Sequence, residues 1–256
     1  IPLIKEAGAA ALIKIIVIDL KGELTMTAAM EDLMENISLN RICAEWAKKS
    51  WMTTRGLGSW LDNLKQRLEM LNLWKDDPTT INKTICFLNR LYKPNSYLTA
   101  IKQVCAQKTG QGLNKLYIQT DVQKKFHWEP EIPGMLQRIE DGAYVFGFQL
   151  EGAAWEKNSG QMEESIPKQQ FSVVPIIHCK ALQTQEGKVD KAVYMCPCYM
   201  TTNRDKSYVF TAQLKTKHNP AKWVLAGAAL ILDVEGVSDG FYPGQKPPED
   251  AEDKKK

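Results

Sequence analysis

The spacing of apolar residues changes once along this chain, and that change constrains the fold more than any other feature of the sequence. Up to about Val122 the apolar residues recur three and four positions apart, which is typical of helices. After Gly134 they recur at every second position, which is typical of β-strands. We therefore predict an α+β fold, in which an N-terminal α-helical subdomain is followed by a mostly antiparallel, incomplete β-barrel. The expected boundaries are 1–125 for the helical subdomain, 126–236 for the β-barrel subdomain and 237–256 for a disordered tail.

Three stretches of the first half carry helical periodicity. The broadest stripe consists of Leu57, Trp60, Leu61, Leu64, Leu68, Leu71 and Trp74. A shorter helix is predicted around Met26, Met30, Leu33 and Ile37. A third should begin after "KPNS" (93–96), where Pro94 and Asn95 supply stop and cap residues, run through Tyr97, Leu98, Ile101, Val104 and Cys105, and end at Gly110.

The second half begins with "DGAYVFGFQLEGAAWEKNSG", from Asp141 to Gly160. Its glycines are isolated, whereas a phosphate-binding loop needs clustered small residues whose N–H groups converge on an anion. The alternation instead predicts a strand that buries one face, formed by Tyr144, Phe146, Phe148 and Leu150.

Four more segments of the second half have recognisable patterns. Strands are predicted at Phe171–Ala181, Ala192–Met200 and Ser207–Lys215, and a last strand at "ALILDV". Pro175 and Pro197 should lie at edges or bulges, because proline cannot donate to a strand ladder. Asn219 and Pro220 predict the start of a short helix before the last strand.

Composition narrows the class of protein. The 256 residues suit one to two domains, and 44% hydrophobic residues suffice for a core. The net charge of +3 is spread along the chain, unlike the clustered basic surface of a nucleic-acid binder. Six cysteines without a secretory signal favour reduced thiols. The apolar run Ala7–Ile18 is too short to cross a bilayer and is expected to pack against protein, in a chain that we expect to be a piece of a longer one.

Two sequence motifs suggest catalysis but lack its requirements. "GVSDG" (236–240) fits the G-x-S-x-G nucleophile elbow, yet no helix can follow it and the last histidine, His218, lies upstream. Gly187-Lys188 lacks the hydroxyl residue and the first glycine of a phosphate-binding P-loop. Neither motif supports an enzyme.

A zinc site is the more serious chemical alternative. His178, Cys179, Cys196 and Cys198 fall on neighbouring predicted strands, and the last two share a face. Zinc needs four converging ligands, whereas His178 should point away from Cys179. A buried thiol plus a surface one is therefore the favoured interpretation.

The remaining polar candidates form no catalytic group. His127 and His218 are expected in loops without a neighbouring nucleophile, and the pairs Glu163-Glu164 and Asp76-Asp77 on a solvated surface. Trp46 and Trp51, which flank two lysines, are expected to be buried while the lysines stay in solvent. We predict no catalytic, cofactor-binding or metal-binding residue, and hence no cofactor.

The order of several motifs matches one family. "GAYVFGFQLEGAAWEKNSG" (142–160), "VPIIHCKA" (174–181), "YMCPCY" (194–199) and "KWVLAGAALIL" (222–232) follow one another in the family's order, and the helical half agrees through "GLGSWLDNLKQRLEMLNLW". Over about 23–234, the chain resembles the C-terminal region of dynein heavy chains, which follows the last AAA+ module of the motor ring. The segment from Ser207 to Leu232 is most similar to axonemal, outer-arm-type chains.

The resemblance implies a function without chemistry of its own. The chain would be a regulatory and structural domain that packs on the AAA+ ring of the same heavy chain and modulates ATP-driven movement along microtubules in a cilium or flagellum. Its partners would be that ring and, indirectly, microtubules and other dynein subunits, with neither nucleic acid nor membrane. Gly147 and Gly152 would bend a strand so that it closes the barrel, with aromatic residues inside.

Two alternatives of other classes remain open. A free-standing β-barrel could hold a small ligand among Tyr144, Phe146 and Phe148, which would require an open interior. The zinc-stabilised interaction domain is the second alternative.

Overall fold

The computed structural model describes residues 27–127, 129, 132–137, 139, 141–183 and 192–234. Contacts divide the chain into two compact units, residues 1–51 with 56–61 and residues 52–55 with 62–256. The apolar run at 7–18, the Gly187-Lys188 pair, "GVSDG" and the tail at 237–256 lie outside the described residues.

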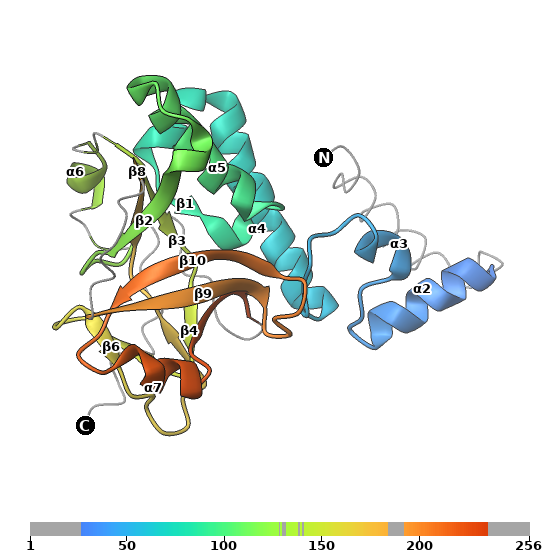
Figure 1. Ribbon diagram of the computed structural model, residues 1–256. Coiled ribbons are helices and arrows are strands. Elements are labelled where there is room, and N and C mark those ends of the chain that lie inside the picture. Colours follow the sequence, from blue (N-terminus) through green and yellow to red (C-terminus); the bar gives the residue numbers. More distant parts are fainter. Residues whose placement is uncertain are drawn as a thin grey trace. The chain divides into compact units, whose positions relative to one another are not determined.

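Both halves of the predicted periodicity are found as regular elements (Figure 1). The helices are α2 (Ala28–Ser38), α3 (Ala44–Ala47), α4 (Leu57–Asp76), α5 (Pro94–Thr109), α6 (Ile132–Gln137) and α7 (Pro220–Leu225), with short 3-10 helices η1 (Pro78–Lys83), η2 (Leu88–Arg90) and η3 (Leu113–Lys115). The strands are β1 (Cys86–Phe87), β2 (Leu116–Val122), β3 (Ala143–Phe146), β4 (Gln149–Glu151), β5 (Ala154–Glu156), β6 (Gln161–Glu163), β7 (Phe171–Val173), β8 (Ile177–Gln183), β9 (Val193–Thr201), β10 (Tyr208–Lys215) and β11 (Ala229–Asp233).

The first unit is organised around Trp60. Its indole stacks between those of Trp46 and Trp51, with ring centroids 5.9 and 5.6 Å away, and its Nε1 donates to Ser50 Oγ at 2.7 Å. Trp51 is buried as expected, while Trp46 forms the partly exposed outer layer of the stack. Asn40 Oδ1 accepts from the Gly58 N–H at 2.9 Å, which fixes the first turn of α4.

Helix α4 buries a different stripe from the one predicted. Trp60 and Leu64 are buried, but Leu61 is 39% exposed. Asn63 and Arg67 are fully buried instead. Arg67 Nε donates to Asn63 Oδ1 at 2.7 Å, so the guanidinium is buried together with its acceptors.

Helix α5 ends and helix α7 starts at the predicted residues. Helix α5 starts at Pro94, ahead of the predicted start after Ser96, and stops at Gly110, whose φ of +68° is the left-handed conformation that glycine favours. In α7 the Oδ1 of Asn219 accepts from the Ala221 N–H at 3.0 Å, with Pro220 in the first turn.

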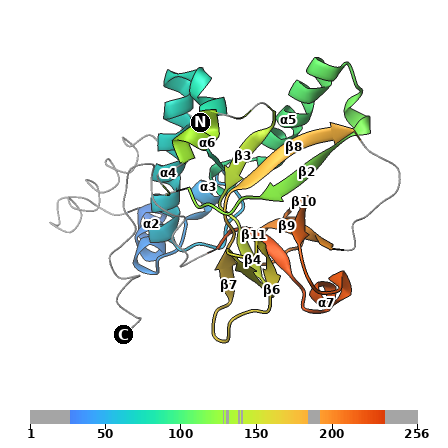
Figure 2. The same cartoon turned by 90° about the vertical axis from the view of Figure 1, so that its left-hand side faces the viewer.

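The strands of the second unit form three sheets. The first sheet has the order β1-β3-β8-β2, the second β10-β9-β11-β4-β7, and β5 pairs with β6. Pairing is antiparallel except between β1 and β3 and between β11 and β9. Figure 2 shows the first sheet above the second within this unit. The α+β class with mostly antiparallel strands is confirmed, and no sheet among the described residues closes into a barrel.

The two sheets meet along one pair of edges. Thr120 Oγ1 of β2 accepts from the backbone N–H of Gln213 in β10 at 2.6 Å and donates to its carbonyl oxygen at 3.1 Å. A side chain thus links edges that have no backbone ladder between them. Because β1 and β2 precede residue 125 yet pair with β3 and β8, the first sheet draws strands from both sides of the expected boundary at 125/126, and that boundary stays a prediction.

The glycine-punctuated segment does not form one strand with one buried face, so that prediction is wrong. Gly147, with φ of +102°, separates β3 in the first sheet from β4 in the second. Phe146 therefore packs against Phe87 at 5.6 Å, whereas Phe148 packs against Phe210 at 6.1 Å in the core between the sheets. At this point the backbone crosses from one sheet to the other instead of bending to close a barrel.

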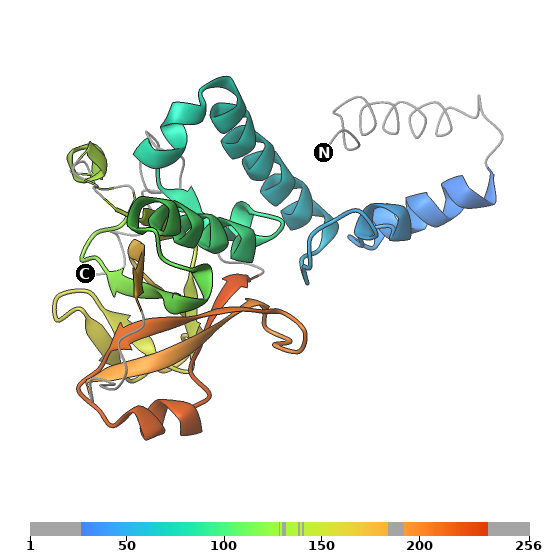
Figure 3. The ribbon, with the colours of Figure 1, turned by 45° about the horizontal axis from the view of Figure 1, so that its top comes forward.

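The core between the sheets is apolar. Its fully buried members include Phe148, Leu150, Ile177, Cys196, Leu214 and Leu230, and α5 covers it through Leu98 and Ile101. Trp223 of α7 enters the same core, on the side of the unit opposite α5 (Figure 3). Pro175 lies between β7 and β8, outside both strands.

Candidate docking surface

Strand β9 of the β9–β10 hairpin is apolar on both of its faces, whereas the outer face of β10 carries Tyr208, Thr211, Gln213 and Lys215. Tyr194, Cys196 and Cys198 of β9 point into the core, so the residues between them point out. The register places Met195 opposite Gln213, Pro197 opposite Thr211, and Tyr199 opposite Tyr208. We call the outward-facing apolar residues the outer strip: Val193, Met195, Pro197, Tyr199 and Tyr208.

The outer strip is substantially exposed. The exposed fractions of Met195 and Tyr208 are 46% and 52%. Tyr208 packs edge-on against Tyr199 at 6.0 Å, and its hydroxyl lies 2.9 Å from Thr211 Oγ1, so its orientation is fixed. Pro197 lies where β9 has not yet begun to pair with β11, which makes that side of the strand locally an edge, as expected for proline. The strip is therefore ordered apolar surface of the hairpin whose strands, β9 and β10, are labelled in Figure 1.

The strip continues a buried surface of the same sheet. Ile231 of β11 lies beside Tyr199, and Ala229, Ile231 and Val234 form a buried cluster on which Tyr199 and Phe171 pack. The same sheet face is thus covered over β11 and uncovered over β9 and β10. Contiguous exposed apolar surface of this kind marks interaction sites.

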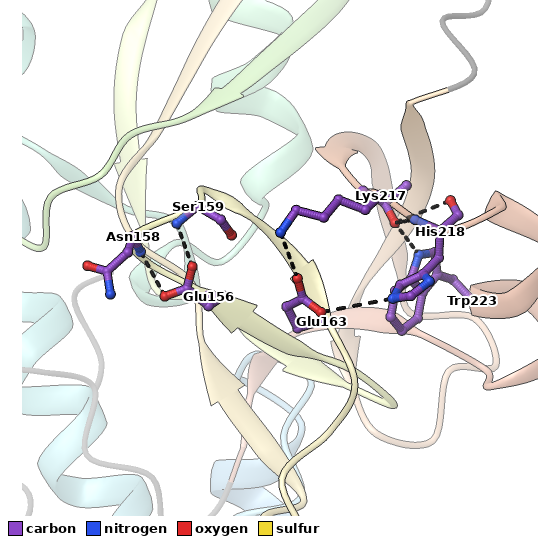
Figure 4. Close-up of polar contacts among 8 residues, drawn as sticks. Glu156, Asn158, Ser159, Glu163, Lys217, His218 and Trp223 are labelled. Carbon is purple, nitrogen blue, oxygen red and sulfur yellow. Dashed lines mark hydrogen bonds and ion pairs between the residues drawn. The ribbon is translucent and has the colours of Figure 1, made fainter.

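A network of polar contacts fixes the segment beyond the end of β10 (Figure 4). Thr216 Oγ1 accepts from Trp223 Nε1 at 2.7 Å and from the His218 N–H at 3.1 Å. Glu163 of β6 accepts from Lys217 Nζ at 3.3 Å, and its other oxygen lies 3.9 Å from His218 Nε2. These contacts join β6, β10 and α7 at one end of the hairpin.

A second polar contact in Figure 4 shapes the turn between β5 and β6. The Glu156 carboxylate accepts from the backbone N–H groups of Ser159 and Asn158 at 2.5 and 2.9 Å. These hydrogen bonds, that from Ser159 first, lower the pKa of Glu156 to about 2. The arrangement is a turn closed by hydrogen bonds between a carboxylate and backbone N–H groups.

Three lysines near the strip are paired within the domain. Lys215 Nζ lies 3.0 Å from Asp121 Oδ1, and Lys222 Nζ lies 2.5 Å from Glu164 Oε1. Together with the pair of Lys217 and Glu163, they leave little local net charge. The surface is therefore suited to an apolar partner.

The four candidate zinc ligands, His178, Cys179, Cys196 and Cys198, do not all lie on the same side of their strands. Cys196 and Cys198 share the inner face as predicted, and Cys179 of β8 lies in the same apolar core. Burial raises the pKa of the Cys179 thiol to about 12 and raises those of Cys196 and Cys198, so metal-binding thiolates are disfavoured. His178 points away, with Nε2 2.8 Å from the Asp141 carbonyl oxygen. Within the described ranges, no group of three or more His, Cys, Asp or Glu side chains could hold a metal ion.

The other polar candidates are found in structural roles. His127 is buried against Phe87 and Phe146, with ring centroids 5.0 and 4.5 Å away. Asp77 caps η1 by accepting from the Thr79 N–H at 3.0 Å. No helix in the described part of the sequence is long and apolar enough to span a membrane.

Sequence reasoning missed the outer strip, although a signal for it is present. In "AVYMCPCYM" nearly every residue of both parities is apolar, which a strand with one solvated face does not require. That pattern is typical of a strand that is buried on both faces.

Comparisons with known proteins agree with the resemblance seen in the sequence. The family model that describes the C-terminal domain of dynein heavy chains matches residues 13–232. The flagellar outer arm dynein beta chain of Chlamydomonas reinhardtii is 40% identical over 84% of this chain and 4% of its own length. Human dynein axonemal heavy chain 9 is 37% identical and the ciliary dynein beta chain of Tripneustes gratilla 36% identical, each over 84% of this chain and 5% of its own length.

This chain thus spans about one twentieth of the relatives that it matches. The match nevertheless covers most of the sequence, includes every motif on which the resemblance depended, and confirms it. The protein belongs to the family of C-terminal domains of dynein heavy chains.

Proposed function

We propose that this chain is the C-terminal, non-catalytic domain of an axonemal dynein heavy chain, and that it packs on the AAA+ motor ring of that heavy chain. In this role it modulates ATP-driven movement along microtubules in cilia or flagella, while ATP is hydrolysed elsewhere in the heavy chain. The names of the relatives, which are axonemal, ciliary and flagellar dyneins, support this assignment. We further propose that the two sheets, linked through Thr120 and Gln213, act as one incomplete barrel.

The outer strip is the observation that carries the proposal. It extends the covered surface of β11, Lys215 beside it is paired with Asp121, and Tyr199 and Tyr208 pack on each other. A ring surface that covered Met195 and Tyr208 would complete a cluster that the domain leaves half open. If different nucleotide states of the ring covered different amounts of the strip, the domain would favour one state by the difference in contact free energy.

The packed interior favours a domain that packs against other protein, and it argues against a barrel that holds a ligand. Phe148, Leu150 and Leu230 are fully buried, and Phe148 packs on Phe210. A ligand-binding barrel needs an open interior where this domain has packed side chains.

Oxidation of methionines in the full heavy chain tests the docking directly. Met195 and Met52 form a matched pair, since their exposed fractions are 46% and 51% and only Met195 belongs to the outer strip. Under limiting peroxide, Met195 should oxidise several times more slowly than Met52 in the folded heavy chain, and at the same rate after unfolding. Equal rates in the folded protein would overturn the docking of this face.

Substitution of the strip tests the regulatory part. Met195→Asp with Tyr208→Asp, made in the full heavy chain, should alter the ATPase rate and the microtubule gliding velocity. The control is Val104→Asp with Leu113→Asp, two residues of similar exposure on α5 and η3. If the strip variant matches wild type in both measurements, the domain does not regulate the motor through this face.

A further inference from the structure

Strand β11 ends next to the outer strip. Ile231 of β11 lies beside Tyr199, which belongs to the strip. Two residues later Asp233 lies beside Thr201 of β9, which is already past the strip. Val234 then joins the buried cluster on which Tyr199 packs. The chain therefore leaves β11 beside the exposed apolar surface of β9 and β10.

The sequence after Val234 contains one aromatic and proline-rich stretch. It reads "FYPGQKPP" (241–248), and we call it the proline-rich segment. Asp239-Gly240, a pair of residues typical of turns, comes directly before it. The segment lies outside the described residues and outside residues 13–232, which the family model matches. It therefore does not belong to the part of the chain that this model describes.

The chemistry of the segment suits the strip. Proline-rich chain favours the extended polyproline II conformation, and in that conformation it binds exposed aromatic side chains with little loss of entropy. The strip offers Tyr199 and Tyr208, whose rings pack edge-on with centroids 6.0 Å apart. Phe241 and Tyr242 add two aromatic side chains, which bury about 150–250 Å² each when they are covered.

The lengths of the two also agree. From Val193 to Tyr199 the strip is about 20 Å long, and residues 241–248 span about 25 Å as polyproline II. Because β11 runs parallel to β9, a chain that leaves β11 has to reverse its direction to run back along the strip. Gly236 and Gly240 permit such a reversal, and residues 235–240 can span up to about 20 Å.

The covalent connection favours this segment over a separate molecule. A ligand on a short flexible linker has an effective concentration on the order of millimolar, so even a weak contact is populated. Lys215, the cation beside the strip, lies 3.0 Å from Asp121 Oδ1. An apolar segment can therefore approach without separating a charge from its solvent, whereas an acidic ligand would compete with Asp121.

We propose that the proline-rich segment folds back over the outer strip and competes there with the AAA+ ring. This inference rests on the proposed function, which makes the ring the other occupant of the strip. When the segment is bound, the apolar surface is covered and the contact with the ring is lost. When the ring is bound, the segment is displaced. The segment is thus an autoinhibitory element that lowers the occupancy of the docking surface.

Photo-crosslinking in the full heavy chain identifies the occupant of the strip. Met195→p-benzoylphenylalanine places a photoreactive group on the strip, and Val104→p-benzoylphenylalanine places one at an exposed position of α5 as the control. After irradiation, mass spectrometry should find the proline-rich segment cross-linked to position 195 several times more often than to position 104. In a mixture with isotope-labelled heavy chain, the two cross-linked peptides should carry the same label.

A double substitution in the segment tests the competition. Phe241→Ser with Tyr242→Ser removes the two aromatic side chains and keeps the length of the chain. In this background the cross-link from position 195 to the segment should fall several-fold. Cross-links from position 195 to the ring should rise, because the competing occupant is weakened.

Each other outcome overturns the inference. Cross-links from position 195 to the ring alone, unchanged by the double substitution, would remove the segment and leave the proposed function in place. Cross-links to neither would remove both. Equal cross-linking of the segment to positions 195 and 104 would show contact without a site, and peptides with different labels would identify a second copy as the donor of the segment. A lost segment cross-link that no ring cross-link replaces would remove the competition.

Discussion

The interior between the two sheets and the interior beside α4 are built from opposite kinds of side chain. Between the sheets, Phe148, Leu150 and Leu230 are fully buried and carry no polar side-chain atom. Beside α4, the fully buried side chains include Asn63, Arg67, Asn89 and Arg90. Both regions belong to the second unit.

The polar interior depends on specific partners. Arg67 donates to Asn63 Oδ1 and to the carbonyl oxygen of Asn89, while the guanidinium of Arg90 lies 3.8 Å from the centre of the Phe87 ring. Arg55 pairs with Asp233 at the end of β11, and both are buried. An apolar core tolerates substitutions that preserve its volume, whereas a buried polar group without its partner is strongly destabilising. Substitutions in the two interiors should therefore destabilise the domain for different reasons: lost volume between the sheets, and lost polar partners beside α4.

The largest effect is expected in the apolar core. Phe148→Ala should lower the free energy of unfolding by about 3–5 kcal/mol, because it removes a fully buried ring and leaves a cavity. Phe148→Leu, which retains much of the volume, should lose clearly less. Urea unfolding of the purified variants measures both values. Equal losses for the two substitutions would mean that volume does not govern this core.

Removing one partner of the buried ion pair of Arg55 and Asp233 should lower the free energy of unfolding more than replacing both partners by apolar residues. Asp233→Asn should destabilise the domain by about 3 kcal/mol, because it leaves the Arg55 charge buried without its carboxylate. Replacing both residues by leucine should cost less than the single substitution. If the double variant proves the less stable of the two, the pair stabilises the fold in its own right and the comparison with the apolar core fails.

The sequence predicts the elements of the apolar core well, because local patterns determine them. Alternation identifies β10, and helical spacing with a glycine stop identifies α5. The helix α7 follows from Asn219 and Pro220 alone. Which strand joins which sheet is not a local property, so the crossing at Gly147 could not be read from alternation.

The polar interior could not be predicted, because its stability depends on acceptors distant in sequence. An arginine within a helix normally reaches solvent. Arg67 is buried because the carbonyl oxygen of Asn89, 22 residues later, accepts its N–H group. The outer strip was not predicted for another reason. Alternation indicates which residues share a face of a strand, but it does not indicate whether a partner covers that face.

The crossing between the two interiors should be sensitive to a single methyl group. Gly147→Ala should cost about 2 kcal/mol, because its φ of +102° strains an L-residue. In addition, a Cβ there would lie 2.5 Å from Asn89 Oδ1. Unfolding of Gly147→Ala in the wild-type and Asn89→Ala backgrounds separates the two causes. In the Asn89→Ala background, Gly147→Ala should lower the free energy of unfolding by less, because the steric clash is gone and only the backbone strain remains. Identical losses in the two backgrounds would exclude a clash with Asn89.

The smallest effect is expected for a carboxylate at the surface, and it sharpens the contrast with buried Asp233. Glu156 has a folded pKa of about 2, below its ordinary value of 4.5, owing mainly to the N–H of Ser159. A lowered pKa means that its contribution to stability is full above pH 4.5 and is lost as the pH falls toward 2. Glu156→Gln should therefore be slightly less stable than wild type at about pH 6. The difference in the free energy of unfolding should shrink as the pH falls from 4.5 toward 2. Because the Glu156 carboxylate is in contact with solvent, screening keeps the effect far below that of Asp233→Asn.

Stability measurements between about pH 6 and pH 3, with an NMR titration of the Glu156 carboxyl group, test this prediction. Asn158→Ala is the matched control, since it keeps the backbone N–H that Glu156 accepts and should leave the titration unchanged. A Glu156 carboxyl group that titrates near 4.5 would show that the turn does not hold its charge. Glu156→Gln could also lower the free energy of unfolding at about pH 6 as much as Asp233→Asn does. Burial would then not explain why the two carboxylates differ, because backbone N–H groups alone would stabilise a surface carboxylate equally well.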